Sequence, residues 1–213
     1  MKARRRLGAF IIDLFIVVML ATTLANLSYL NPYKDQYNEC QNELNNVMID
    51  YQGVISDVSS KDSFKTALNY VNDKMVPLLM VLEKYNVFNL IWYVLIFFLY
   101  NVLFAYFNNG QTLGKKIFKL KVVNKGENNV SFSRMLIRGL FNGSSLYFGV
   151  VIVAIIRIFT SLIMNKYVFL VLFYGVEGLS YILEISLLIT LFTSKGTRLT
   201  NDIIAKTEVI EVK

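Results

Sequence analysis

Four apolar stretches dominate the pattern of hydrophobic and polar positions along this chain. They cover residues 7–30, 86–107, 140–164 and 167–193. A helix needs about 20 apolar residues to cross the hydrocarbon core of a membrane, so each stretch is long enough. The pattern therefore predicts an all-α polytopic membrane protein, with about four transmembrane helices in a single membrane domain over residues 1–213. Because only two residues separate the last two stretches, we expect them to form a tight antiparallel hairpin.

Shorter patterns occupy the segments between these stretches. In the loop of residues 31–85, apolar residues recur at helical spacing from Leu68 to Leu82. We therefore expect a helical loop insertion whose last helix continues into the second span. In residues 117–123 and in residues 206–213, successive side chains alternate between two faces, as they do in a strand. We predict that these two segments pair in a small cytoplasmic β-sheet.

A short amphipathic helix is expected just before the third span. Ser131 or Ser133 would cap its N-terminus, and Met135 would lie on its apolar side. Arg134 and Arg138 would lie on the opposite side. Such a helix is typical of a segment that lies at the membrane interface.

Basic residues indicate how the chain is oriented. The chain has 22 Lys and Arg residues, 15 Asp and Glu residues and a net charge of +7. Fifteen of the basic residues flank the N-terminus, the connection between the second and third spans, and the C-terminal tail, whereas six lie in the opposite loops. Because Lys and Arg are enriched in cytoplasmic loops, we expect both termini in the cytoplasm and residues 31–85 outside it. The positive charge then reflects membrane topology, and we expect no nucleic-acid partner.

The N-terminal stretch is expected to remain as a membrane helix. A signal peptide has an apolar region of about 7–15 residues, whereas this stretch has about 24 and contains Asp13. The protein is therefore predicted to be a multi-pass protein of the cell membrane.

Composition disfavours enzyme chemistry. The chain has no histidine, which removes the commonest general base and the commonest metal ligand. Cys40 is the only cysteine, so neither an intramolecular disulfide nor a cysteine-based metal site can form. We expect no catalytic residues, no metal and no cofactor. Cys40 is then a free thiol, or a partner in an intermolecular disulfide where the compartment is oxidising.

Four charged residues within the predicted spans are candidates for a proton or ion pathway. They are Asp13 in the first span, Arg157 in the third, and Glu177 and Glu184 in the fourth. Charge inside hydrocarbon costs about 2.5–3.5 kcal/mol at a helix centre, so such residues usually face a bundle interior or a water path. A structural ion pair is the alternative explanation for each of them.

Spacing suggests which of these charges meet. Glu177 and Glu184 are seven residues apart and share one face of a helix. The hairpin would bring Arg157 close to Glu177. Asp13 would pair with Arg6, Arg138 or a polar group on another helix. We predict that Glu184 and Asp13 line a polar cavity open to the cytoplasm.

Four short motifs follow one another along the chain, over residues 6–13, 110–116, 131–138 and 198–207. Together they resemble the motifs of the RDD family of bacterial membrane proteins, whose first motif has an Arg, a small residue and an Asp at this spacing. Leu113 replaces the usual Pro of the second motif, and Asn201 replaces a frequent His of the last. The positions that carry the resemblance are Arg6, Asp13, Gly110, Gly114, Lys115, Arg134, Arg138 and Asp202.

The resemblance implies a multi-span membrane protein of a family suspected of transport, some members of which are linked to cation/proton exchange. One hypothesis is therefore a transporter of a small cation or solute coupled to protons. Four spans are few for a transporter, so this hypothesis favours a homodimer in the lipid bilayer. The alternative is a non-catalytic accessory, assembly or sensor module, whose basic cytoplasmic face docks a partner or anionic lipid.

Overall fold

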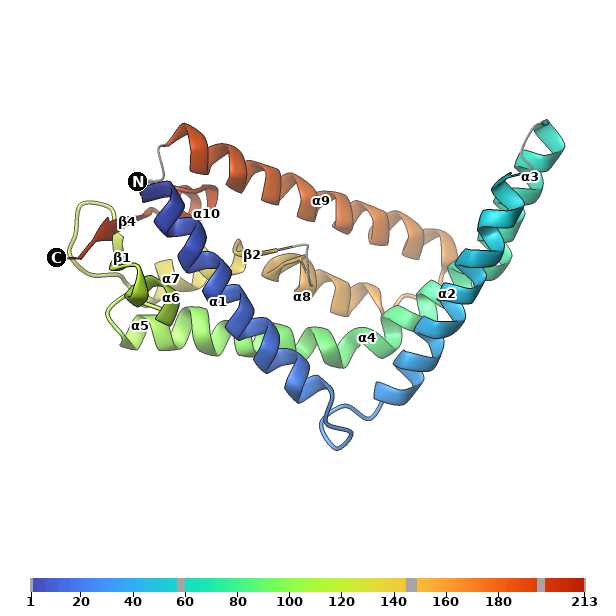
Figure 1. The fold of residues 1–213 in the computed structure, drawn as a ribbon, viewed down its shortest axis with the longest axis horizontal. Coiled ribbons are helices and arrows are strands. Elements are labelled where there is room, and N and C mark those ends of the chain that lie inside the picture. Colours follow the sequence, from blue (N-terminus) through green and yellow to red (C-terminus); the bar gives the residue numbers. More distant parts are fainter. Residues whose placement is uncertain (1, 57–59, 145–148, 195–197, 213) are drawn as a thin grey trace.

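The computed structural model describes residues 2–56, 60–144, 149–194 and 198–212. Helices form an elongated bundle, and a helical arm projects from one end of it (Figure 1). Three helices in the described part are long and apolar enough to cross a membrane. The two ends of the chain lie together at the opposite end of the bundle from the arm (Figure 1). This arrangement agrees with a polytopic membrane protein that has both termini on one side.

The first long helix is α1 (Lys2–Ala25), which crosses the bundle diagonally beside α4 (Figure 1). Its buried face carries Ala9, Val17 and Ala21, and the small alanine side chains allow close approach of neighbouring elements. The helix ends five residues before the predicted end of the first span. Asn31 explains this end, because its side-chain amide donates a hydrogen bond to the carbonyl of Ala25 at 3.0 Å.

The second long helix is continuous from Lys61 to Phe107. At about 1.5 Å per residue its 47 residues extend about 70 Å, more than twice the hydrocarbon thickness of a bilayer. Part of it must therefore lie outside the hydrocarbon core. The expected continuation of the loop helix into the second apolar stretch is confirmed. Its segments are α3 (Lys61–Tyr70), η1 (Val71–Met75), α4 (Val76–Phe97), η2 (Phe98–Phe104) and α5 (Ala105–Phe107), of which η1 and η2 are π-helical.

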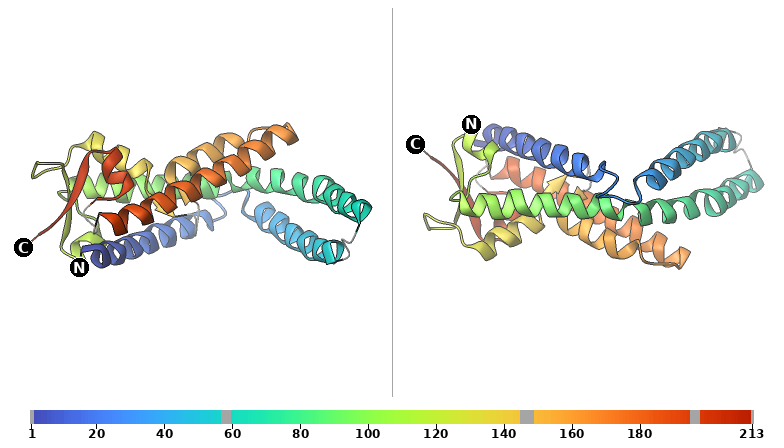
Figure 2. Two further views of the ribbon diagram at one scale, coloured as in Figure 1. Left: turned by 90° about the horizontal axis from the view of Figure 1, so that it is seen from above. Right: turned by 90° about the horizontal axis from the view of Figure 1, so that it is seen from below.

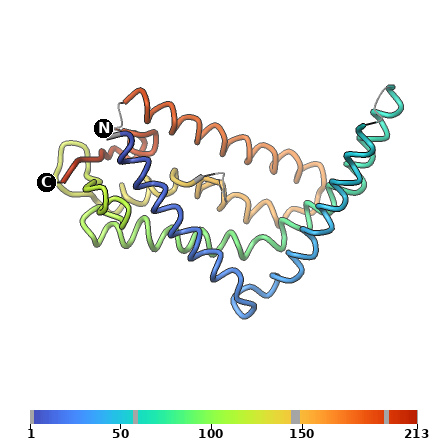
Figure 3. The backbone as a smooth tube through the Cα atoms, in the orientation of Figure 1, coloured from blue at the N-terminus to red at the C-terminus, as the bar shows by residue number. Residues whose placement is uncertain are grey.

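The arm is a helical hairpin, as the sequence predicts for the loop of residues 31–85. Helix α2 (Lys34–Ser56) runs antiparallel to α3 and the start of α4, and Figures 2 and 3 show this pair extending beyond the bundle. Tyr51 stacks on Tyr70 with a centroid separation of 5.9 Å. Residues 57–59 of this loop lie outside the described residues.

The third predicted span is not a continuous helix, which corrects the sequence-based expectation for residues 140–164. The chain instead forms α7 (Phe132–Leu140), the two-residue strands β2 (Gly143–Ser144) and β3 (Gly149–Val150), and α8 (Val151–Thr160). Residues 145–148 lie outside the described residues. The ten residues of α8 are about 15 Å long, roughly half of a hydrocarbon core.

Glycine conformation accounts for this break. Gly143 and Gly149 have φ angles of +136° and +82°, which side chains with a Cβ rarely adopt. The two glycines belong to paired strands, and the hydroxyl of Tyr93 on α4 donates a hydrogen bond to the carbonyl of Gly149 at 2.9 Å. The expected helix N-terminal to this break is confirmed: α7 begins directly after Ser131.

The last long helix, α9 (Lys166–Thr193), closely matches the fourth predicted span. The side chain of Asn165 caps its N-terminus and accepts hydrogen bonds from the backbone amides of Tyr167 and Val168, both at 3.1 Å. The short connection after α8 forms the tight hairpin that the sequence predicts.

A small cap of short elements covers the end of the bundle where the termini lie. It contains α6 (Leu113–Ile117), β1 (Leu120–Asn124), α10 (Thr200–Ile204) and β4 (Thr207–Glu211). The predicted pairing of the tail with the earlier strand is confirmed, because β1 and β4 are antiparallel with Val122 opposite Val209. Strand β1 begins three residues later than predicted, since residues 113–117 are helical.

Candidate functional site

Asp13 on α1 accepts hydrogen bonds from four donors that lie about 90 to 100 residues away in the sequence. One carboxylate oxygen, Oδ1, accepts from the hydroxyl of Tyr100 at 2.8 Å and from the backbone amide of Gly114 at 2.9 Å. The other, Oδ2, lies 2.5 Å from the hydroxyl of Thr112 and 3.3 Å from the ammonium of Lys115. The Asp13 side chain is only 5% exposed, so these contacts replace hydration of its charge.

Local structure explains why α6 presents these donors. Thr112 caps α6 by accepting a hydrogen bond from the backbone amide of Lys115. At Gly114, a Cβ atom would collide with the carbonyl oxygen of Ala9 and come within 2.8 Å of Oδ1 of Asp13. Glycine therefore lets the backbone of α6 approach α1. The first and second sequence motifs meet through this contact.

Two oxygen atoms, one from Thr112 and one from Asp13, contact the ammonium of Lys115. Its ammonium lies 2.9 Å from the hydroxyl of Thr112 and 3.3 Å from Asp13, and its side chain is 11% exposed. Burial lowers the pKa of Lys115 to about 8, although the attraction of Asp13 opposes this shift. Lys115 can therefore lose its proton near physiological pH, which an exposed lysine does not do.

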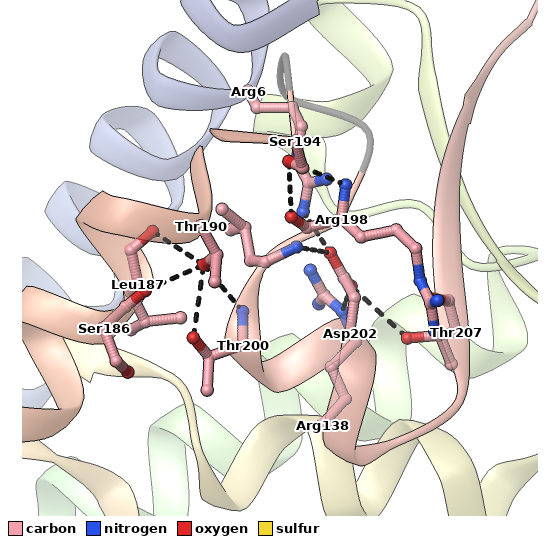
Figure 4. A network of polar contacts seen from close by, with 11 residues as sticks. Arg6, Arg138, Ser186, Leu187, Thr190, Ser194, Arg198, Thr200, Asp202 and Thr207 are labelled. Atoms are coloured by element: carbon pink, nitrogen blue, oxygen red, sulfur yellow. Dashed lines mark hydrogen bonds and ion pairs between the residues drawn. The ribbon is translucent and has the colours of Figure 1, made fainter. Parts of the chain in front are cut away.

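Asp202 in α10 is the centre of a second ion-pair network, shown in Figure 4. It pairs with Arg6 of α1 and with Nε of Arg138 on α7, the latter at 2.8 Å. It also accepts hydrogen bonds from the amide of Leu199 at 2.9 Å and the hydroxyl of Thr207 at 3.3 Å. Arg6 and Arg138 thus bind Asp202 and not Asp13. Asp13 instead contacts polar groups on other elements, the third of the predicted options, and forms an ion pair with Lys115 that was not predicted.

The charge of Asp202 is fixed. Burial alone would raise the pKa of this carboxyl group, but the two guanidinium groups outweigh burial and lower the pKa to about 2. Since arginine does not lose its proton in proteins, Arg6 and Arg138 stay charged as well. This network holds α1, α7 and α10 together without exchanging protons.

The end of α9 is tied to the same network (Figure 4). The hydroxyl of Thr190 accepts a hydrogen bond from the backbone amide of Thr200 at 2.9 Å. The hydroxyl of Ser194 donates to the carbonyl of Arg198 at 2.6 Å. Next to Asp202, the side-chain amide of Asn201 is buried and makes no hydrogen bond to the described residues.

A cavity of about 50 Å³ lies between the two networks. Arg6, Asp13, Lys115 and Arg138 line it, together with Asn101, Asn142 and apolar side chains. With Asp202 directly behind them, the charged groups are three cations and two carboxylates, which leaves one surplus positive charge while Lys115 is protonated.

Glu184 is not among the residues that line this cavity. Asp13 contributes to the cavity as predicted, whereas Glu184 lies half-buried on α9, so the structure does not bring the two acids together there.

A further charge cluster lies on the arm side of the bundle. The predicted pair forms: the guanidinium of Arg157 on α8 lies 3.0 Å from the carboxylate of Glu177 on α9. Sequence reasoning missed the stronger partner, Glu83, which contacts Arg157 at 2.5 and 3.3 Å and is 6% exposed. Glu83 comes before the second apolar stretch, within the segment of residues 31–85 that the sequence predicts as a loop. The run of apolar residues with helical spacing on both sides of it was the signal that could have placed it in the bundle.

The remaining motif positions support the cap. Gly110 has a φ angle of +83°, and a Cβ there would collide with the carbonyl oxygen of Val122 in β1. Arg134 lies 3.7 Å from Glu127 near the surface and does not line the cavity. Six motif residues therefore converge on the two networks, and two shape the structure around them.

The three helices of the described part that are long and apolar enough to cross a bilayer indicate an integral membrane protein. The chain belongs to the RDD family, whose model matches residues 2–206. This match confirms the resemblance that the four motifs suggest. No curated protein and no solved structure matches the chain.

Proposed function

We propose that this protein exchanges a small monovalent cation for protons across the membrane, and that the Asp13–Lys115 pair is the site where the two compete. One observation carries this proposal: the Lys115 ammonium lies against Asp13 and Thr112 at a cavity, where a cation could take its place. Carboxylate and hydroxyl oxygens are ligands that hard cations prefer.

Charge balance explains why binding would be competitive. While Lys115 is protonated, the cluster around the cavity already has one surplus positive charge, which disfavours a second cation. When Lys115 Nζ releases its proton to water, the cluster becomes neutral and the oxygens of Asp13 and Thr112 become available. A bound cation then restores the original charge, so one proton leaves for each cation that enters. The arginines beside Asp202 keep their charge throughout.

We assign the second half of the pathway to the opposite end of the bundle. Arg157 faces two carboxylates, so this cluster has one surplus negative charge that a proton or cation would balance. Glu177 is the more exposed of the two acids, at 27% against 6% for Glu83. Glu184 lies about 10 Å further along α9 towards the cap, a position suited to relay charge between the two ends.

Inside-out vesicles with a pH-sensitive dye test this proposal. Addition of Na+, K+ or Li+ at pH 8 is expected to change the internal pH with wild type. The response should disappear in Asp13→Asn and in Lys115→Arg at matched expression. Lys115→Arg is the sharper variant, because arginine keeps the positive charge at Asp13 and cannot release the proton. Glu184→Gln should reduce the rate.

A non-catalytic accessory module is the competing function. The observation in its favour is that four donors surround Asp13 and four surround Asp202, as expected of buried charges with a purely structural role. Well-expressed wild type that gives no cation response would support this function and contradict exchange. Variants that lose expression rather than flux would point the same way.

A further inference from the structure

A second and larger cavity lies where the arm meets the bundle. It has a volume of about 220 Å³ and lies between the end of α1, the start of α2 and the middle of α4. Apart from Ala25, every lining residue has a side chain that can form hydrogen bonds. Most of this lining consists of Thr22, Asn26, Asn31, Lys34, Asn38 and Asn89.

Part of this lining is fixed by internal hydrogen bonds. The amide of Asn31 donates to the carbonyl of Ala25 at 3.0 Å and to the side chain of Asn89 at 3.2 Å. Asn89 in turn donates to the side chain of Asn86 at 3.1 Å. Asn31 is 2% exposed, so this wall is formed before any ligand arrives. Small-molecule sites are usually largely pre-formed, and placed polar groups in them fix the orientation of the ligand.

Other groups of the lining are available to a ligand. The ammonium of Lys34 and the side-chain amide of Asn38 make no hydrogen bond or ion pair with the described residues. Lys34 is the only charged residue of the lining, and the neighbouring acids Asp35 and Glu39 are exposed and do not line it. The cavity therefore offers one positive charge and several uncharged hydrogen-bonding groups.

We infer that this cavity binds a small organic anion, with one carboxylate at Lys34 and further hydroxyl or amino groups hydrogen-bonded to the asparagine amides. The single positive charge disfavours an inorganic cation and balances one carboxylate, whereas a phosphate dianion would keep a second, unbalanced negative charge. The volume suits a solute the size of a hydroxy acid or an amino acid. This site is separate from Asp13, and the inference does not depend on cation exchange.

Binding of lactate to the purified full-length protein in detergent tests this inference. Ligand-observed NMR should detect binding of lactate but not of glycerol, which has hydroxyl groups without the carboxylate. Lys34→Gln is expected to weaken binding about tenfold or more, the usual loss for a charge-assisted contact. Lys61→Gln, a matched change on the exposed start of α3, should leave binding unchanged.

Three outcomes would overturn the inference: no binding of lactate, equal binding of glycerol, or equal binding by Lys34→Gln. Lys115→Arg separates this result from the proposed exchange. It leaves the arm-side cavity intact, so lactate binding should persist in that variant even though cation exchange is lost.

Discussion

At the residue scale, two buried aspartates with similar hydrogen-bond counts have different properties because their basic partners differ. Asp202 is paired with two arginines, which cannot release a proton. Asp13 is paired with Lys115, which can. The first arrangement gives a fixed charge and the second gives a group that responds to pH. The basic partner thus distinguishes the two sites: arginine gives structural support at Asp202, and lysine permits the exchange proposed at Asp13.

Asp202 should make the protein sensitive to acid. Its pKa falls from 3.8 in the unfolded chain to about 2 in the folded protein, so its ionised form stabilises the fold above pH 4. This contribution, of about 2 kcal/mol, is lost as the pH falls from about 4 to 2. Thermal unfolding in detergent should show a falling Tm over this window. Asp202→Asn should have a lower Tm at pH 7 and lack this component of the pH dependence; parallel curves for the two proteins would contradict the assignment.

Which of these residues meet was only partly predictable from the sequence. Arg157 and Glu177 could be paired, because a tight hairpin places nearby positions of two helices side by side. The donors to Asp13 could not be predicted, because Thr112 and Gly114 reach α1 only through the cap. The sequence gives no local signal for that contact. Arg138 was expected on a polar surface, but its partner Asp202 lies 64 residues away.

At the element scale, helices α1, α4 and α9 follow from apolar length alone. The third span failed as a prediction because apolar composition does not distinguish a continuous helix from a broken one. The break depends on Gly143 and Gly149 in backbone conformations that favour glycine. The strand pair of the cap was predictable. Two separate segments each show the side-chain alternation of a strand, and each strand needs a partner for its backbone hydrogen bonds.

The Arg157 cluster joins α4, α8 and α9, and its two acids should contribute unequally to stability. Glu83 makes two contacts with the guanidinium and is 6% exposed, whereas Glu177 makes one and is 27% exposed. Removing one partner of a buried pair costs about 3–5 kcal/mol. Glu83→Gln should therefore lower the Tm clearly more than the isosteric change Glu177→Gln. An equal or larger effect of Glu177→Gln would show that Glu83 is not the main partner.

At the scale of the whole molecule, the two ends of the bundle differ. The cap with both termini lies at one end, and the arm lies at the other (Figures 1 and 2). Because basic residues gather at the cap end, we expect this end in the cytoplasm. The four motifs were enough to predict family membership, but they did not predict the fold. Their residues converge on one end of the molecule and say little about the rest.

Cysteine labelling in intact cells checks this orientation. In a Cys40→Ser background, Gly53→Cys on the arm and Asn128→Cys in the cap each place one thiol at an exposed position. A membrane-impermeant maleimide should label the arm thiol, and it should label the cap thiol only after the cells are permeabilised. The reverse pattern would invert the assigned topology and exchange the two sides of the proposed pathway.

The most direct test of the account is proton release on cation binding, measured with purified protein in weakly buffered detergent solution. At pH 7, where Lys115 with its pKa of about 8 is still largely protonated, addition of Na+ to wild type should release roughly one proton for each cation bound, because the cation replaces the proton of Lys115. Lys115→Arg should release none, although its ion pair with Asp13 is kept. Absence of release from wild type, or equal release from Lys115→Arg, would contradict the claim that Asp13 and Lys115 form the exchange site.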